Sequence, residues 1–305
     1  MKRKSYDPNA LNSRLLRKPI QRCFPLFVAP TLIAFCIGFL YPFLLGIYRS
    51  FCKFTSPVDY EWDGFSNYLK AFEDEGFRQA FGFTAVYAVV SIVLINVLAF
   101  TVAYALTQKL RGSNVFRTVF FMPNLIGGIV LGYIWKLIFD AALKSMQLEQ
   151  LASNSTYGFW GLVILVAWQQ IGYMMIIYIA GLQAVPEDML EAAKIDGASR
   201  WQTLWRVTIP NVMPSITICV FLTLTNSFKL FDQNLALTEG NPVVTQASGV
   251  QVKTTEMLAL HIFNTNKINN HWKGTAQAEA VIFFLLVAAL ALIQLRLTRK
   301  KEVQQ

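Results

Sequence analysis

The sequence predicts an all-α, polytopic membrane protein with six transmembrane helices and a structured cytoplasmic loop. Residues of the AVILMFWYC class make up 54% of the 305 residues, and charged residues only 15%, whereas globular chains average about 45–50% and about 25%. The mean hydropathy is +0.42. Six apolar runs approach or exceed the length of about 20 residues that a helix needs to cross a bilayer. So much apolar surface indicates that lipid surrounds the chain.

The six runs are predicted to be helices because none alternates at period two, as the strands of a membrane barrel do. They run, in order, over Phe24–Tyr48, Phe81–Leu106, Val115–Trp135, Tyr157–Gln183, Asn211–Phe231 and Ala278–Leu297. The first run exceeds the 7–15 apolar residues of a signal peptide and is expected to stay as an anchor. The sixth is the shortest, with 16 residues between Glu279 and Arg296.

The distribution of Lys and Arg predicts the orientation. With both termini and the second and fourth connections placed inside, 17 of the 27 basic residues and six of the 18 acidic residues are cytoplasmic, as the positive-inside rule requires. The net charge of +9 is therefore a topology signal, and no nucleic-acid partner is expected. We divide the chain into a cytoplasmic basic segment 1–22, a first helix with outer loop 23–80, a transmembrane core 81–297 and a cytoplasmic tail 298–305.

The connection at 184–210, between the fourth and fifth runs, has the signals of a helix–turn–helix. Pro186 suits the first position of a helix, and the two acids that follow it place negative charge at the positive end of the helix dipole. Asp196-Gly197 predicts the end of this helix, because glycine readily adopts the left-handed conformation that a helix C-terminus uses.

A second short helix is expected to begin at Ser199, which forms a capping box with Gln202, and to end at Pro210. Three large apolar side chains gather on one of its faces: Trp201, Leu204 and Trp205. Such a face either lies on the membrane surface or docks a soluble subunit.

This connection resembles the EAA loop of permease subunits in binding-protein-dependent ABC importers, and especially carbohydrate permeases of the maltose and glycerol-3-phosphate type. The resemblance is carried by Glu191-Ala192-Ala193-Lys194-Ile195-Asp196-Gly197-Ala198 and Val207-Thr208-Ile209-Pro210. Supporting similarities are Pro30 through Tyr41-Pro42 to Ser50-Phe51, Phe121-Met122-Pro123 with Trp135, the LTxGGP-like stretch Leu237–Pro242, and Gly274–Ala280. The departures are Val207 and Ile209, where the pattern often has Ile and Leu, and Asn241, which replaces the second glycine of LTxGGP.

The resemblance implies a type I-like ABC importer permease in the plasma (inner) membrane, forming half of a translocation pathway. Its EAA loop would be a coupling helix seated in a cleft of a separate nucleotide-binding ATPase subunit. The contact residues carried over are Glu191, Ala192, Ala193, Asp196 and Gly197. The further partners implied are a second permease subunit, in a heterodimer, and an extracytoplasmic solute-binding protein.

The sequence predicts no enzyme, no cofactor and no metal site. It contains no G-x-x-x-x-G-K-[ST] motif to bind nucleotide phosphates, so ATP hydrolysis is assigned to a partner chain. His261 and His271 lack metal-ligand spacing, and no Ser/His/Asp grouping is supported.

Polar and aromatic residues inside the fourth and fifth runs are the candidates for a substrate path, because such groups are costly in a membrane unless used. They are Gln169, Gln170, Tyr173, Asn226 and Ser227, together with Leu230. In related carbohydrate permeases, residues at matching positions line the sugar pocket. The alternative is that they only join helices, through hydrogen bonds worth about 0.6 kcal/mol each.

The alternative function is a polytopic membrane protein outside the ABC class, such as a secondary transporter or an assembly factor. An ion-coupled secondary transporter usually carries ionisable groups at mid-membrane, and the runs contain almost none. The solute remains open between a sugar, a polyol and a glycerophosphate.

Overall fold

The computed structural model describes residues 24, 26–56, 59–108, 112–268 and 272–299. The expected cytoplasmic segment 1–22 and most of the expected tail lie outside the described residues, and so do both termini.

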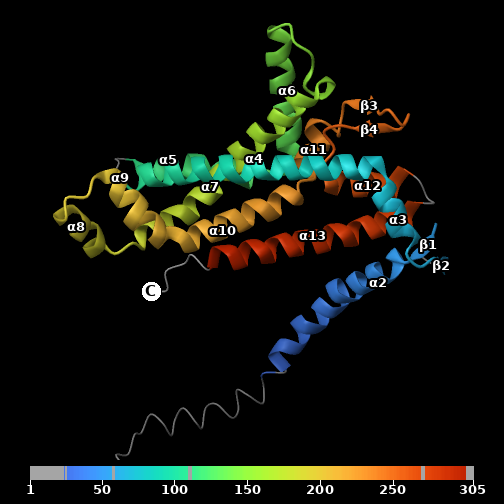
Figure 1. The fold of residues 1–305 in the computed structure, drawn as a ribbon, viewed down its shortest axis with the longest axis horizontal. Helices are drawn as coiled ribbons and strands as arrows, with labels where there is room; N and C mark the ends of the chain where they lie inside the picture. The colour runs from blue at the N-terminus through green and yellow to red at the C-terminus, as the bar shows by residue number, and fades with distance from the viewer. Residues whose placement is uncertain (1–23, 25, 57–58, 109–111, 269–271, 300–305) are drawn as a thin grey trace, which may run out of the picture.

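Four long helices run side by side and form the body of the protein (Figure 1): α4 (Glu75–Leu106), α7 (Ser155–Gln183), α10 (Ile209–Phe228) and α13 (Lys273–Arg299). The main core lies between α4, α7 and α10 and includes the buried side chains of Tyr87, Ile95, Leu162, Leu165, Met174 and Tyr178. Within this core, the Tyr178 hydroxyl donates to Asn96 Oδ1 at 2.7 Å, and Asn96 Nδ2 donates to Thr223 Oγ1 at 3.2 Å. These bonds tie the three helices together, as interhelical hydrogen bonds do in membrane proteins.

Five of the six expected spans are confirmed as helices that are long and apolar enough to cross a membrane. In the described part of the chain they cover Leu26–Ser50, Glu75–Leu106, Ser155–Gln183, Arg200–Phe228 and Lys273–Thr298. The first contains a π-helical turn, η1 (Cys36–Leu40), before α2 (Tyr41–Ser50), and α2 runs at an angle to the four-helix body (Figure 1).

The third expected span, Val115–Trp135, is not one continuous helix: it falls within two helices that together have the length and apolar character of one broken span or a re-entrant loop. The chain forms α5 (Ser113–Phe121), the 3₁₀ turn η2 (Met122–Leu125) and α6 (Gly128–Ser145), and the two arms are bent by 100°. Pro123 has no N–H to continue the helix, and Ile126 and Gly127 adopt extended backbone angles. As a result α6 projects from the bundle (Figure 1).

Short elements gather at the end of the bundle where α4 and α13 begin. They are α3 (Ser66–Glu73), η3 (Leu151–Ser153), α11 (Asp232–Leu237), α12 (Leu258–Ile268) and two antiparallel hairpins, β1 (Cys52–Phe54) with β2 (Tyr60–Trp62) and β3 (Val243–Thr245) with β4 (Gln251–Lys253). The fold is thus helical with two small hairpins, in agreement with the predicted class.

The opposite end holds α8 (Glu187–Ile195), α9 (Arg200–Thr203) and the π-helical turn η4 (Leu204–Thr208). The expectation that Pro210 ends the helix after the turn is wrong, because α9, η4 and α10 form one helix over Arg200–Phe228. In the wider π turn the Ile209 N–H bonds to the Leu204 carbonyl. Such a local adjustment lets a membrane helix pass through a proline.

Candidate functional site

The turn after α8 is built around Gly197. This residue has a φ of +74°, which a residue with a side chain adopts only at a cost. The Gly197 N–H donates to the Lys194 carbonyl at 3.1 Å, and the Ala198 N–H donates to the Ala193 carbonyl at 2.9 Å. Together these bonds form a Schellman motif, which confirms the glycine-terminated helix predicted from the sequence.

The helix after this turn begins with the predicted capping box. The Gln202 N–H donates to the Ser199 hydroxyl at 3.3 Å, and the Ser199 N–H donates to Gln202 Oε1 at 2.8 Å. Because both sides of the turn are closed by local bonds, the angle between α8 and α9 is fixed within the chain itself.

Most of the residues carried over as ATPase contacts lie on the surface of α8 and its turn. Glu191, Ala192, Asp196 and Gly197 are exposed, while Ala193 is only 9% exposed and packs inward. The sequence analysis missed Ile195, whose side chain is 85% exposed. Its position four residues after Glu191, on the same helical face, was the available signal. The α8 surface therefore combines an acid with an unpartnered apolar side chain.

The face of α9 and η4 that carries the two tryptophans does not belong to the exposed surface of α8. The Trp201 and Trp205 rings meet edge to face at 5.7 Å, and with Leu204 they line a groove of about 920 Å³ against α4 that also includes Phe100 and Tyr104. The exposed surface of α8 and this groove are thus two separate surfaces of the same loop.

Three of the six residues proposed for a substrate path line one polar cavity. Gln170, Asn226 and Leu230 surround a space of about 270 Å³, and Asn226 Nδ2 donates to Gln170 Oε1 at 3.5 Å. Four residues missed by the sequence analysis complete the lining: Lys229, Phe231, Asp232 and Gln233. The available signal was the group of charged and polar residues at the end of the fifth run and directly after it, next to Asn226.

Gln169 lies beside this cavity and not in its lining. It is 7% exposed; its Nε2 donates to the Ile126 carbonyl at 3.1 Å, and its Oε1 accepts from Gln233 Nε2 at 2.7 Å. Gln169 thus connects α7 to the break between α5 and α6 and to α11.

The last two candidates lie away from the lining. Ser227 is buried on α10, at 3% exposed, and Tyr173 is 36% exposed on α7. Their assignment to a substrate path stays a prediction.

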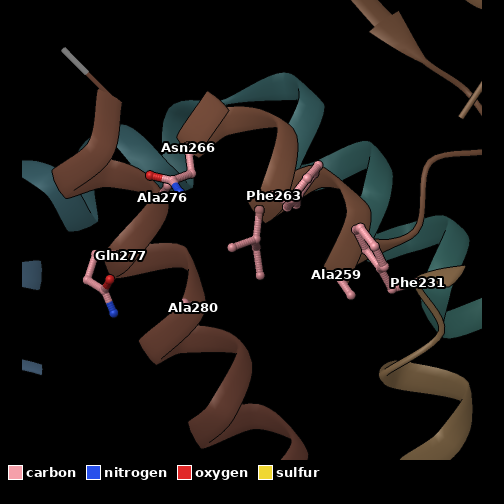
Figure 2. Close-up of a pocket in the computed structure, with 8 residues that line it drawn as sticks. Phe231, Ala259, Phe263, Asn266, Ala276, Gln277 and Ala280 are labelled. Carbon is pink, nitrogen blue, oxygen red and sulfur yellow. The ribbon is translucent and has the colours of Figure 1, made fainter. Parts of the chain in front are cut away.

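A second cavity, of about 430 Å³, lies between α12, α13 and the start of α11. Figure 2 shows the phenyl rings of Phe231 and Phe263 on one side of it and the amides of Asn266 and Gln277 on the other. The Phe231 and Phe263 rings meet edge to face at 5.0 Å. Phe231 contributes to the walls of both cavities, which are therefore neighbours.

Sequence comparisons identify the chain's relatives. A probable starch degradation products transport system permease protein, AmyD, of Thermoanaerobacterium thermosulfurigenes is 42% identical over 286 residues, covering 92% of this chain and 94% of that protein. A multiple sugar-binding transport system permease protein, MsmF, of Streptococcus mutans serotype c is 31% identical over 287 residues, covering 91% and 95%.

The fold has a counterpart among solved structures. A chain in the crystal structure of a bacterial ABC transporter involved in the import of the acidic polysaccharide alginate superimposes with a TM-score of 0.76 at 19% identity, covering 93% of this chain and 98% of that chain. Residues 95–303 match the model of the family described as binding-protein-dependent transport system inner membrane component. The chain therefore belongs to this family and is a permease subunit of an ABC importer.

Proposed function

We propose that this subunit forms half of the transmembrane pathway for a carbohydrate, paired with a second, different permease subunit. ATP hydrolysis is supplied by separate ATPase subunits, and the sugar is delivered by an extracytoplasmic solute-binding protein. The names of the two relatives, which refer to starch degradation products and multiple sugars, support a carbohydrate. The family description, binding-protein-dependent transport, supports the binding protein.

The polar cavity between α7, α10 and α11 is the observation that carries this proposal. Its lining offers the amides of Gln170, Asn226 and Gln233, one charge of each sign from Lys229 and Asp232, and the ring of Phe231. A sugar presents hydroxyl groups that need both donors and acceptors, and apolar ring faces that pack on an aromatic side chain. The lining supplies both the hydrogen-bonding groups and the aromatic ring, and the charges of Lys229 and Asp232 cancel.

The second cavity supports a path that continues beyond Phe231. It repeats the same chemistry, with two phenyl rings opposite the amides of Asn266 and Gln277. We infer that solute passes from the Phe263 side to the Asn226 side, and that Phe231 lies between the two positions.

The exposed surface of α8 is assigned to the ATPase subunit. Glu191 would pair with a basic group of that subunit and Ile195 would enter an apolar recess. An 85% exposed isoleucine loses contact with water only when a partner covers it, which is favourable. On this assignment the α8 end of the bundle is cytoplasmic, and we propose the same side for both termini from the distribution of Lys and Arg.

The test of the path is sugar uptake divided by the amount of assembled complex. Asn226→Ala and Gln170→Ala should lower this ratio at least tenfold, because each removes a cavity amide. Thr225→Ala is the matched control. Thr225 is next to Asn226 in sequence, but its hydroxyl donates to the carbonyls of Phe221 and Leu222 on its own helix, so the ratio should not change. An unchanged ratio in both cavity variants would mean that these amides only pack helices.

A further inference from the structure

A cluster of charged side chains lies at the end of the bundle opposite α8, where the starts of three helices meet. Asp74 caps α4, with Oδ1 accepting from the Gly76 N–H at 2.9 Å. His261 belongs to α12, and Glu279 to the second turn of α13. One possible ligand atom from each of these three residues lies within 4.8 Å of the other two.

The distances within the cluster match those around a small metal ion. His261 Nε2 is 3.1 Å from Asp74 Oδ2 and 3.8 Å from Glu279 Oε1. Ligand atoms bound tetrahedrally to zinc at about 2.0–2.2 Å are about 3.3–3.6 Å apart. The two observed distances lie on either side of this range, and all three atoms lie within 4.8 Å of one another, so an ion between them would draw the three side chains together.

The second imidazole nitrogen of His261, Nδ1, has a carboxylate partner, as is common in metal-binding histidines. His261 Nδ1 is 3.0 Å from Glu256 Oε2. Glu256 in turn accepts a bond from Asn264 and lies 3.8 Å from the Lys253 ammonium. A histidine that binds a metal through one nitrogen commonly donates its other N–H to a carboxylate, which fixes the ring and its tautomer.

Glu279 is the independent observation that points to a ligand. Its side chain is 0% exposed, and neither carboxylate oxygen has a hydrogen-bond partner among the described residues. Burying a carboxylate without hydrogen bonds is strongly unfavourable unless a cation compensates it. Because Oε1 is directed at His261 Nε2, a metal ion bound there would provide that compensation.

The charges around His261 favour a cation. Three carboxylates face the imidazole, and Lys253 is the neighbouring basic side chain.

The cluster can be reached from a cavity and has room for the ring. A space of about 320 Å³ is lined by Asp74, Glu256, His261, Thr265 and Trp272, among others. Gly76 also lines it, and a Cβ at this position would lie 2.8 Å from His261 Cε1. The glycine therefore lets the imidazole lie against the start of α4.

We propose that Asp74, His261 and Glu279 bind one divalent transition metal ion of the zinc type, which clamps the starts of α4, α12 and α13 together. Carboxylate and imidazole ligands suit such an ion. A ligand that binds only the folded chain stabilises it by an amount set by its concentration relative to Kd. The site is separate from the sugar path, so the proposal does not depend on the solute.

The test uses the importer complex purified through a tag on this chain and stripped with a chelator. The wild-type complex should bind one Zn²⁺ per chain with a micromolar or lower Kd, measured by titration and elemental analysis, and its unfolding temperature should rise with added Zn²⁺. Glu279→Gln and Asp74→Asn should each weaken Zn²⁺ binding at least tenfold. Glu256→Gln, which removes only the partner of Nδ1, should weaken it by about 10–100-fold while one ion per chain still binds at saturation.

Glu75→Gln is the matched control, because Glu75 follows Asp74 in sequence but bonds to Ser248 instead. It should bind Zn²⁺ as the wild type does. The proposal is overturned if the stripped wild-type complex binds no Zn²⁺ at micromolar concentration. It is equally overturned if Glu279→Gln and Asp74→Asn bind Zn²⁺ unchanged. Should Glu279→Gln prevent assembly, the wild-type stoichiometry and Asp74→Asn decide the question.

Discussion

The side-chain amide of Gln169 donates a hydrogen bond to the main-chain carbonyl of Ile126, 3.1 Å away. Ile126 lies where the chain leaves the helical path between η2 and α6, so its carbonyl has no helical partner. A buried glutamine in the central helix thus satisfies a backbone group that the break exposes. This contact explains how a 100° bend is held beside an apolar core.

Gln169→Leu should destabilise the protein and not merely slow transport. It removes the hydrogen bonds to the Ile126 carbonyl and from the Gln233 amide, at a cost of about 0.5–1.5 kcal/mol for each bond lost. Denaturant unfolding of the purified subunit measures the loss, and Gln170→Leu, whose amide makes only the 3.5 Å contact, is the control. An unchanged unfolding midpoint with reduced uptake would instead make Gln169 a path residue.

Gly172→Val should separate α5 from α7. A Cβ at this position would overlap the Phe120 carbonyl, and because that group is backbone it cannot rotate away. We expect a loss of several degrees in unfolding temperature, or no assembled complex. Gly82→Ala in α4, where a Cβ meets no atom within 4 Å, should be neutral or slightly stabilising. Equal stability of the two variants would contradict the close packing of α5 on α7.

The sequence predicted best what is decided locally. Apolar length located the helices, and Gly197 with Ser199 located the turn after α8, because capping bonds join residues close in sequence. The prediction from sequence failed where contacts between residues far apart in the chain decide the structure. The run around Ile126 contains the local break signals Pro123, Asn124 and Gly127-Gly128, but the contact that holds the 100° bend comes from Gln169, 43 residues away.

The missed site residues have the same explanation. Gln233 follows the fifth run in sequence, but α11 brings its amide to Gln169. His261 has no ligand spacing along the chain, since its neighbours Asp74 and Glu279 come from other helices. Pro210 was expected to end a helix, and only the π turn at Leu204–Thr208 shows why it does not.

Gly197→Pro should uncouple the subunit from its ATPase. Proline fixes φ near −65°, whereas the residue has a φ of +74°, so α8 would be redirected. Sugar-stimulated ATP hydrolysis should fall at least tenfold while the subunit still enters the membrane. Gly197→Asn is the control, because asparagine tolerates a positive φ, and it should retain most of the activity. Full activity of Gly197→Pro would refute the docking role of the loop.

The α8 end of the bundle should be cytoplasmic. In a background lacking the four native cysteines, a cysteine at Lys194 should be protected from a membrane-impermeant maleimide in intact cells. A cysteine at Asn266, exposed at the opposite end, should react. Opening the cells should make both react. The reverse pattern would invert the orientation derived from the basic residues.

The most direct test of the importer assignment is ATP-dependent sugar uptake by the complex, purified through this chain and reconstituted into vesicles with its binding protein. We expect labelled oligosaccharide to accumulate only when ATP reaches the α8 side. Glu191→Lys should abolish uptake, and the exposed Glu61→Lys at the opposite end should not. Uptake that proceeds without ATP and follows an ion gradient, or that survives Glu191→Lys unchanged, would contradict the account.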